Sequence, residues 1–324
     1  MGVFDKRITF KPHEVPELYD FVDAINHSYW LHTEFSYEGD LHDFHVNLSS
    51  AEKQAMTNAM LAISQIEINV KRFWANLYNH FPKPEFDALG VCFAEAEIRH
   101  SRAYSNVIEL LGLNNAFDTL IENPVIQGRI DYLSKYLKSA GSDNKQLYTL
   151  TLVLFSLFIE NCSLFSQFLI IKSFNTYRNL FKGIDNVIQA TIKEEQIHAL
   201  GGAYIVNLIK KENPDWFDAE FFSTIEKACK KAFSAEQKII DWIFADGELD
   251  FLPKTVVLEF TKDRFNKSME MIGAQPLFEI DQALLKTVQW FDVELLAETH
   301  TDFFVKTPAL YIKKARPITE NDLF

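Results

Sequence analysis

Six residues of two chemical types recur at spacings typical of a metal site that binds two ions. Two long segments each carry the pattern Glu-x-x-His, and two others each carry a single Glu. In chain order the candidate ligands are Glu67, Glu97, His100, Glu160, Glu195 and His198. Residues three apart share one face of a helix, so a single helix can give a metal both a carboxylate and an imidazole. A Glu from each of two helices and Glu-x-x-His from each of two others is the ligand set of carboxylate-bridged di-iron and di-manganese bundles.

A lone Glu-x-x-His is weak support for a metal site, since both residues are common on exposed helix faces. Two of them interleaved with two single Glu residues are far more specific. Glu160 is the most informative of the set because it lies in the apolar run LVLFSLFIENCSLF. A carboxylate in such surroundings is costly unless it is paired or coordinated. A buried salt bridge is the alternative, but no Lys or Arg lies nearby in that segment.

The elements that must position these ligands are predicted to be long helices. The helical period indicates helices at about 16–30, 49–81, 85–111, 126–137, 145–174, 182–211, 217–245, 253–272 and 281–300. Ser49-Ser50-Ala51-Glu52 is typical of a capping box at a helix start. Intervals of 30 residues from Glu67 to Glu97 and 35 from Glu160 to Glu195 fit a helix, a turn and an antiparallel return. We therefore expect an all-α four-helix bundle with additional helices, a polar irregular segment at 32–48, one domain over 1–306 and a flexible tail over 307–324.

Composition and charge exclude several classes of function. The chain has 324 residues, 48% of them hydrophobic, with 29 Phe and only 11 Gly. Its net charge of −13 disfavours binding to nucleic acid or to an anionic membrane, because both need clustered Lys and Arg. The longest uncharged apolar run, residues 147–159, is shorter than the ~20 residues of a membrane span. Three scattered cysteines and no apolar leader predict a cytoplasmic protein.

The stretch Glu97-Ile-Arg-His-Ser-Arg-Ala-Tyr104 resembles the pattern E-x-x-H-S-x-x-Y of the radical-generating small (beta) subunit of class I ribonucleotide reductase. The resemblance extends from about residue 25 to His198, and more loosely to the C-terminus. It implies a ferritin-like fold and gives Tyr104 the place of the radical tyrosine. It also implies that Trp30 and then Tyr311, in the tail, relay the oxidising equivalent to a separate large (alpha) subunit. The same resemblance implies a homodimer.

Two residues depart from the pattern of many members of this family. Glu67 stands at the first ligand position, and Glu194 stands before the last Glu-x-x-His, where many members have Asp. In the family the residue at position 194 lies between the relay Trp and a ligand His. Oxygen and nitrogen ligands suit manganese and iron alike. With these departures the sequence favours a dinuclear manganese centre modestly over iron.

The leading hypothesis is therefore the small subunit of class I ribonucleoside-diphosphate reductase, an oxidoreductase of deoxyribonucleotide synthesis. Oxygen or superoxide would activate its metal centre, and either Tyr104 or the metals would store the oxidising equivalent. The first alternative is a stand-alone di-metal oxidase or desaturase on the same bundle. The second is a ferritin-like metal store, for which 324 residues are too many.

Overall fold

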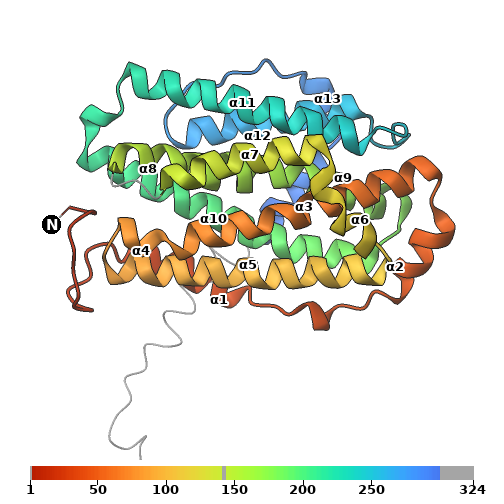
Figure 1. The fold of residues 1–324 in the computed structure, drawn as a ribbon, viewed down its shortest axis with the longest axis horizontal. Coiled ribbons are helices and arrows are strands. Elements are labelled where there is room, and N and C mark those ends of the chain that lie inside the picture. The colour runs from red at the N-terminus through yellow and green to blue at the C-terminus, as the bar shows by residue number, and fades with distance from the viewer. Residues whose placement is uncertain (1, 141–143, 300–324) are drawn as a thin grey trace, which may run out of the picture.

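The computed structural model describes residues 2–140 and 144–299, and within these ranges it contains helices and no strand (Figure 1). The first half of the chain forms α1 (Glu17–His27), η1 (His32–Glu34), α2 (Glu38–His42), η2 (Asp43–Asn47), α3 (Ser50–Ala75), α4 (Leu77–His80), α5 (Pro84–Leu110), α6 (Asn114–Asp118), η3 (Leu120–Glu122) and α7 (Pro124–Ala140). The second half forms α8 (Lys145–Leu152), η4 (Val153–Ser163), α9 (Leu164–Arg178), α10 (Lys182–Glu212), η5 (Pro214–Trp216), α11 (Ala219–Ile243), α12 (Lys254–Met271), α13 (Gln282–Lys286) and α14 (Gln289–Thr299).

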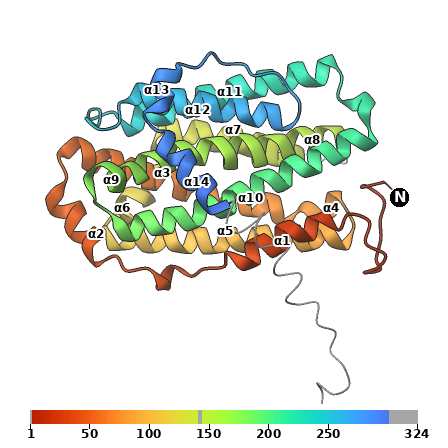
Figure 2. The same cartoon turned by 180° about the vertical axis from the view of Figure 1, so that it is seen from behind.

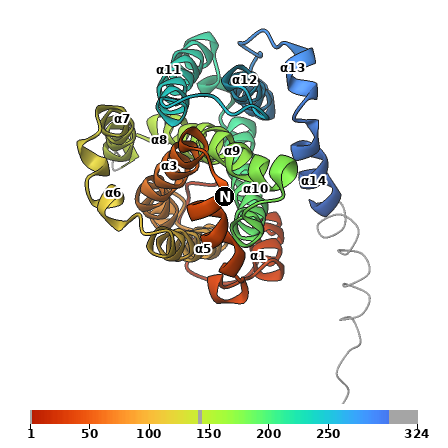
Figure 3. The same cartoon turned by 90° about the vertical axis from the view of Figure 1, so that its right-hand side faces the viewer.

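Four long helical rods form the core of the molecule. They are α3, α5, the continuous rod α8–η4–α9, and α10, and they lie side by side when the molecule is viewed along their length (Figure 3). Helices α11 and α12 cover one side of this bundle, and α1 packs against α5 and α10 on the other. From behind, α14 crosses the bundle next to α10 (Figure 2). The predicted all-α, ferritin-like bundle with additional helices is confirmed.

The helix boundaries follow from local chemistry. Ser49 accepts a hydrogen bond from the Glu52 amide, and Glu52 accepts one from the Ser49 amide at 2.8 Å, so the predicted capping box is confirmed at the start of α3. Pro84 occupies the first turn of α5, where its missing N–H costs nothing. Asn179, in the left-handed conformation, ends α9.

Three predicted helices differ in detail from the observed elements. The segment predicted at 49–81 divides into α3 and α4 at Asn76. The segment predicted at 281–300 divides into α13 and α14 around Thr287, whose hydroxyl donates to the Leu284 carbonyl at 2.7 Å. The rod predicted at 145–174 continues to Arg178, and its middle part, η4, is π-helical. Glu160 lies within this π-helical part, which is frequent at functional sites.

The expectation of an irregular segment at 32–48 is wrong. This segment contains η1, α2 and η2, and it holds the turn between α9 and α10. The buried Asp40 accepts hydrogen bonds from the amides of Gly183 and Ile184 at the start of α10, and Asp43 accepts one from the Phe181 amide. A Cβ on Gly183 would lie 2.1 Å from the Ser36 carbonyl oxygen, so only glycine allows this approach. The polar residues of the segment act as helix caps, which a periodicity argument does not detect.

The rod Lys145–Arg178 is long and apolar enough to cross a membrane by length and composition alone. Its most apolar window is entirely buried inside the protein, surrounded by the other core helices. It is therefore the central core helix of the bundle. The tail boundary at 307 and the predicted relay residue Tyr311 lie outside the described residues, so these two points remain predictions.

Candidate dinuclear metal centre

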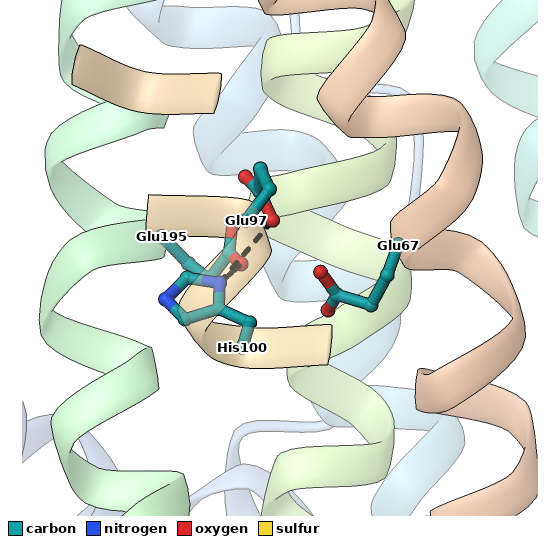
Figure 4. Close-up of side chains that lie close together, drawn as sticks. All are labelled: Glu67, Glu97, His100 and Glu195. Carbon is teal, nitrogen blue, oxygen red and sulfur yellow. Dashed lines mark hydrogen bonds and ion pairs between the residues drawn. The ribbon is translucent and has the colours of Figure 1, made fainter. Parts of the chain in front are cut away.

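The bundle brings the six predicted ligands together at its centre. Glu67 comes from α3, Glu97 and His100 from α5, Glu160 from η4, and Glu195 and His198 from α10. Each of the six is 0–1% exposed. Figure 4 shows four of them converging, with Glu67 reaching from α3 toward the side chains of α5 and Glu195 of α10. The intervals of 30 and 35 residues thus place the ligands at one level of the bundle, as the sequence predicts.

The ligand atoms form two overlapping groups. Glu67, Glu97, His100 and Glu195 form one group, and Glu97, Glu160, Glu195 and His198 form the other, with the ligand atoms of each group within 4.8 Å of one another. We call these the His100 position and the His198 position. Glu97 and Glu195 belong to both groups, which is the arrangement expected of carboxylates that bridge two metals.

Several candidate donor atoms have lone pairs that a bound metal could use. Among the described residues, both carboxylate oxygens of Glu67 and of Glu195, one oxygen each of Glu97 and Glu160, and both ring nitrogens of His198 are buried and make no well-aligned hydrogen bond, although some of them lie close to one another. Buried polar atoms in folded proteins are almost always satisfied. Oxygen and imidazole donors together suit manganese and iron. The residues present therefore fit a pair of divalent cations.

Burial and mutual charge perturb the ligands in opposite directions. Burial, reinforced by the charge of neighbouring carboxylates, raises the pKa of Glu67 and of Glu160 well above its ordinary value. For Glu97, the close contacts with the His100 and His198 imidazoles outweigh the effect of burial and hold its pKa well below the ordinary range. Burial alone would lower the pKa of His198, but the contacts with Glu195 and Glu97 raise it to about 9. Without cations, the cluster compensates by sharing protons between carboxylates and imidazoles.

The two imidazoles point the same ring atom into the centre. His100 Nδ1 lies 3.2 Å from Glu97 Oε2 and 3.1 Å from Glu195 Oε1, and His198 Nδ1 lies 3.0 Å from Glu97 Oε1. The Nε2 atoms of the two imidazoles, which point away from the centre, have different surroundings. His100 Nε2 lies 2.8 Å from Glu194 Oε2, whereas His198 Nε2 has no hydrogen-bond partner among the described residues. The two metal positions are therefore supported differently from outside.

Trp30 lies beside Glu194 and His100. Its indole nitrogen donates to Glu194 Oε2 at 3.1 Å, and the same oxygen contacts His100 Nε2. The Trp30 ring is buried and stacks near the His100 ring, with centroids 6.0 Å apart and planes 15° apart. A continuous chain of contacts thus runs from Trp30 through Glu194 to the ligand His100.

Tyr104 lies one turn of α5 beyond His100 and is 1% exposed. Burial first, and then the negative charge of Glu67, raises the pKa of its phenol well above 10, while the Thr191 hydroxyl acts in the opposite direction. A buried neutral phenol beside the carboxylate cluster is protected from water. The charges of Glu67, Glu195 and Glu97 all act on the Tyr104 phenol, so Tyr104 lies beside the carboxylate cluster.

Comparison with known proteins identifies the family. The sequence profile of the family "Ribonucleotide reductase, small chain" matches residues 7–284. The chain belongs to the ribonucleotide reductase small-chain family. A probable ribonucleoside-diphosphate reductase small subunit of Invertebrate iridescent virus 3 is 25% identical over 322 residues, which cover 95% of this chain and 85% of the viral one. A Mycobacterium tuberculosis ribonucleoside-diphosphate reductase beta subunit is 23% identical over 307 residues, with 93% and 91% covered.

Solved structures show the same fold in ribonucleotide reductase proteins. A putative class I ribonucleotide reductase from Bacillus halodurans superposes with a TM-score of 0.79 at 15% identity, covering 86% of this chain and 99% of its own. The dimanganese(II) NrdF of Streptococcus sanguinis superposes with a TM-score of 0.74 at 16% identity, covering 88% and 100%. The predicted function is confirmed at this level: the protein is a small subunit of ribonucleotide reductase, an oxidoreductase. Neither the stand-alone oxidase nor the metal store is favoured.

Two residues beside the centre were not anticipated for this ribonucleotide reductase subunit. Trp74 of α3 donates its indole N–H to Glu160, and Arg99 of α5 binds Glu194. Trp74 follows Glu67 by seven residues, two helical turns, so the ligand face of α3 could have indicated it. Arg99 lies between the ligands Glu97 and His100 but off their shared face, and no spacing rule points to it.

Proposed function

We propose that this subunit holds two divalent metals, manganese in preference to iron, and uses them to supply the oxidant for deoxyribonucleotide synthesis. The observation that carries the proposal is the pair of overlapping ligand groups, which share Glu97 and Glu195 and leave several buried donor atoms without a well-aligned hydrogen bond among the described residues. When bound, the metals would supply an oxidising equivalent after reaction with oxygen or superoxide.

The residues around the ligands have distinct roles in this proposal. Glu67 and Glu160 would each hold one metal, and Glu97 and Glu195, which belong to both groups, would hold both. His100 and His198, whose Nδ1 atoms face the carboxylates, would each complete one position. The apolar surroundings of η4 exclude water, because every residue from Val153 to Ser163 is buried.

The oxidising equivalent has two candidate stores. It would be held either by the metals or by Tyr104, whose burial would protect an oxidised side chain from water. Trp30 would then carry it outward, with Glu194 accepting or returning the indole proton at Oε2. Tyr311 and the tail 307–324 would complete the transfer by docking to a separate large subunit.

The preference for manganese rests on two residues, Glu67 and Glu194, which stand where many members of the family have Asp. The donor types alone do not decide it, because oxygen and nitrogen ligands suit manganese and iron alike. Glu67, with both oxygens unpartnered, can offer one or two donor atoms to a large, flexible coordination sphere. We further propose that the protein acts as a homodimer in the cytoplasm.

Metal loading separates these possibilities. The metal-free protein would be loaded with Mn(II) or Fe(II), exposed to oxygen or superoxide, and followed by EPR and by metal analysis. We expect two metals per chain and ribonucleotide reduction with a large subunit, with higher activity for manganese. Activity with iron only would contradict the metal assignment, and fewer than two metals per chain would contradict the centre itself.

Two variants separate the roles of Tyr104 and the tail. Tyr104→Phe should abolish activity if the tyrosine holds the oxidising equivalent, and should leave it unchanged if the metals do. Deletion of 307–324 should abolish activity with the large subunit while leaving metal binding intact. A tail-deleted protein with full activity would contradict the docking role.

A further inference from the structure

Arg99 is a buried cation beside the candidate metal ligands, and it makes several charged contacts. Its side chain is 4% exposed, and Nη1 donates to both oxygens of Glu194, at 2.9 Å to Oε1 and 3.0 Å to Oε2. At the other side of the guanidinium, Nε donates to Glu95 Oε2 at 2.9 Å. The Glu95 side chain is 44% exposed, so this contact ties the guanidinium to the molecular surface.

Two aromatic rings hold the guanidinium from its faces. Arg99 Cζ lies 4.7 Å from the centroid of the Tyr29 ring and 5.8 Å from that of the Trp30 ring. A planar guanidinium stacks on aromatic rings and keeps its hydrogen-bonding edge free. Arg99 thus contacts both the donor and the acceptor of the hydrogen bond from Trp30 to Glu194.

The length of the residue at position 194 gives this contact a physical reason. Glu has one more rotatable bond than Asp, so its carboxylate can adopt more orientations, and fixing it costs conformational entropy. Glu194 Oε2 must nevertheless face the Trp30 indole N–H and His100 Nε2 at the same time. Because Arg99 Nη1 donates to both oxygens of Glu194, it holds the carboxylate in the orientation in which Oε2 faces both Trp30 and His100.

We propose that Arg99 is a positioning residue that locks the longer Glu194 carboxylate between Trp30 and His100. It acts through Glu194 and touches no metal ligand itself. The inference rests on the proposed relay function, in which Trp30 and His100 belong to one path. It adds that Arg99 allows a Glu, in place of the shorter Asp, to contact Trp30 and His100 from position 194.

The contact between Arg99 and Glu194 should affect metal binding at the His100 position only. His100 Nε2 is oriented by Glu194, whereas His198 Nε2 has no hydrogen-bond partner among the described residues. Partners that orient a ligating imidazole typically contribute 10–100-fold to metal affinity. Loosening Glu194 should therefore weaken binding at the His100 position and leave the His198 position unchanged.

The test compares Arg99→Met and Arg99→Lys with Arg102→Met in the full chain. Arg102 is exposed on the same helix, three residues farther on, and serves as the matched control. The first readout is the NMR signal of the Trp30 indole N–H in metal-free protein, assigned with Trp30→Phe. The second is an EPR titration with Mn(II) alone. Both readouts are independent of catalytic activity.

We expect the Trp30 signal to move in Arg99→Met and partly in Arg99→Lys, since Lys keeps the charge but cannot bind Glu194 and Glu95 together. Mn(II) affinity should fall about 10-fold at one of the two positions in Arg99→Met. Arg102→Met should match the parent in both readouts. An unmoved Trp30 signal with parental Mn(II) affinity at both positions, or equal effects of Arg102→Met, would overturn the proposal.

A double variant guards against a folding defect and tests the route of action. Arg99→Met combined with Glu194→Gln removes both buried charges together. If Arg99 acts through Glu194, the double variant should bind Mn(II) no more weakly than Glu194→Gln alone. Additive losses would overturn the proposal. If the parent binds Mn(II) but reduces no ribonucleotide with a large subunit, the proposed function fails while these readouts still decide the role of Arg99.

Discussion

At the scale of single residues, each metal position is supported from outside by a different tryptophan. Trp30 reaches the His100 position through Glu194, and Trp74 contacts the ligand Glu160 of the His198 position directly. The indole of Trp74 occupies Glu160 Oε1 and leaves Oε2 as the unpartnered donor atom. Trp74 is fully buried, and its ring packs edge-to-face with Phe93 at 4.9 Å. Glu160 should therefore bind a metal through one oxygen only.

Trp74→Phe should weaken metal binding at the His198 position by about 10–100-fold, because the hydrogen bond that orients Glu160 is lost. Binding at the His100 position should stay unchanged. An Mn(II) titration followed by EPR measures both affinities. Trp242→Phe is the control, since Trp242 is a half-buried residue of α11 whose side chain is not part of the metal centre. Equal losses at both positions would show that Trp74 supports the bundle generally.

Cys92 shows how burial controls reactivity outside the centre. Burial, followed by the charge of Glu95, raises the pKa of its thiol from 9.0 to about 11. The fold thus favours the neutral thiol, so this contribution to stability is present below pH 9 and is lost as the pH rises toward 11. We expect the rate of alkylation by iodoacetamide to rise about tenfold per pH unit up to about pH 11. A plateau near pH 9, as for the urea-unfolded chain, would contradict this.

At the scale of helices, the sequence predicted which rods carry ligands but not how one of them is wound. Glu160 was identified because a carboxylate in an apolar run needs a partner, and that argument holds for any helical geometry. The π-helical η4 packs against α10 and α12, and the local sequence gives no clue to its winding. Arg99 was missed for a similar reason: its partner Glu194 lies 95 residues away on another helix.

The approach of α10 to η4 depends on a glycine close to the ligands. Gly202 lies one turn after His198, and Ser156 lies one turn before Glu160. A Cβ on Gly202 would lie 2.2 Å from both Cβ and Oγ of Ser156. The absence of a side chain at this point therefore lets the two ligand-bearing rods lie close enough to share the His198 position.

Gly202→Ala should destabilise the metal-free protein by about 1–3 kcal/mol through overpacking. It should also weaken metal binding at the His198 position, since the two rods must move apart. Gly128→Ala is the matched control, because Gly128 is exposed within α7 and a Cβ there meets nothing within 4 Å. That substitution should stabilise the protein by up to about 1 kcal/mol through helix propensity. Urea denaturation measures both, and a neutral Gly202→Ala would refute the close-packing argument.

At the scale of the whole molecule, the carboxylates of the metal centre repel one another within the core when no metal is bound. The chain carries a net charge of −13, and four carboxylates of the centre lie at the middle of the bundle, each 0–1% exposed. Each comes from a different one of the four rods, so repulsion among them opposes the packing of the entire bundle. Cations that bind the folded state relieve this repulsion and are bound poorly by the unfolded chain. Metal binding and folding should therefore be coupled.

Removal of metal should lower the thermal stability of the subunit. With Mn(II) at 100 times its Kd, each occupied position should add about 2.7 kcal/mol, and the melting temperature should rise by roughly 2 °C for each kcal/mol. Calorimetry with Mn(II) and with a chelator measures the difference. His198→Ala should keep about half of the increment, because it leaves the His100 position complete, whereas Arg102→Met should keep all of it. Identical melting temperatures with and without metal would contradict the coupling and would mean that protons shared between the carboxylates and imidazoles already relieve the repulsion.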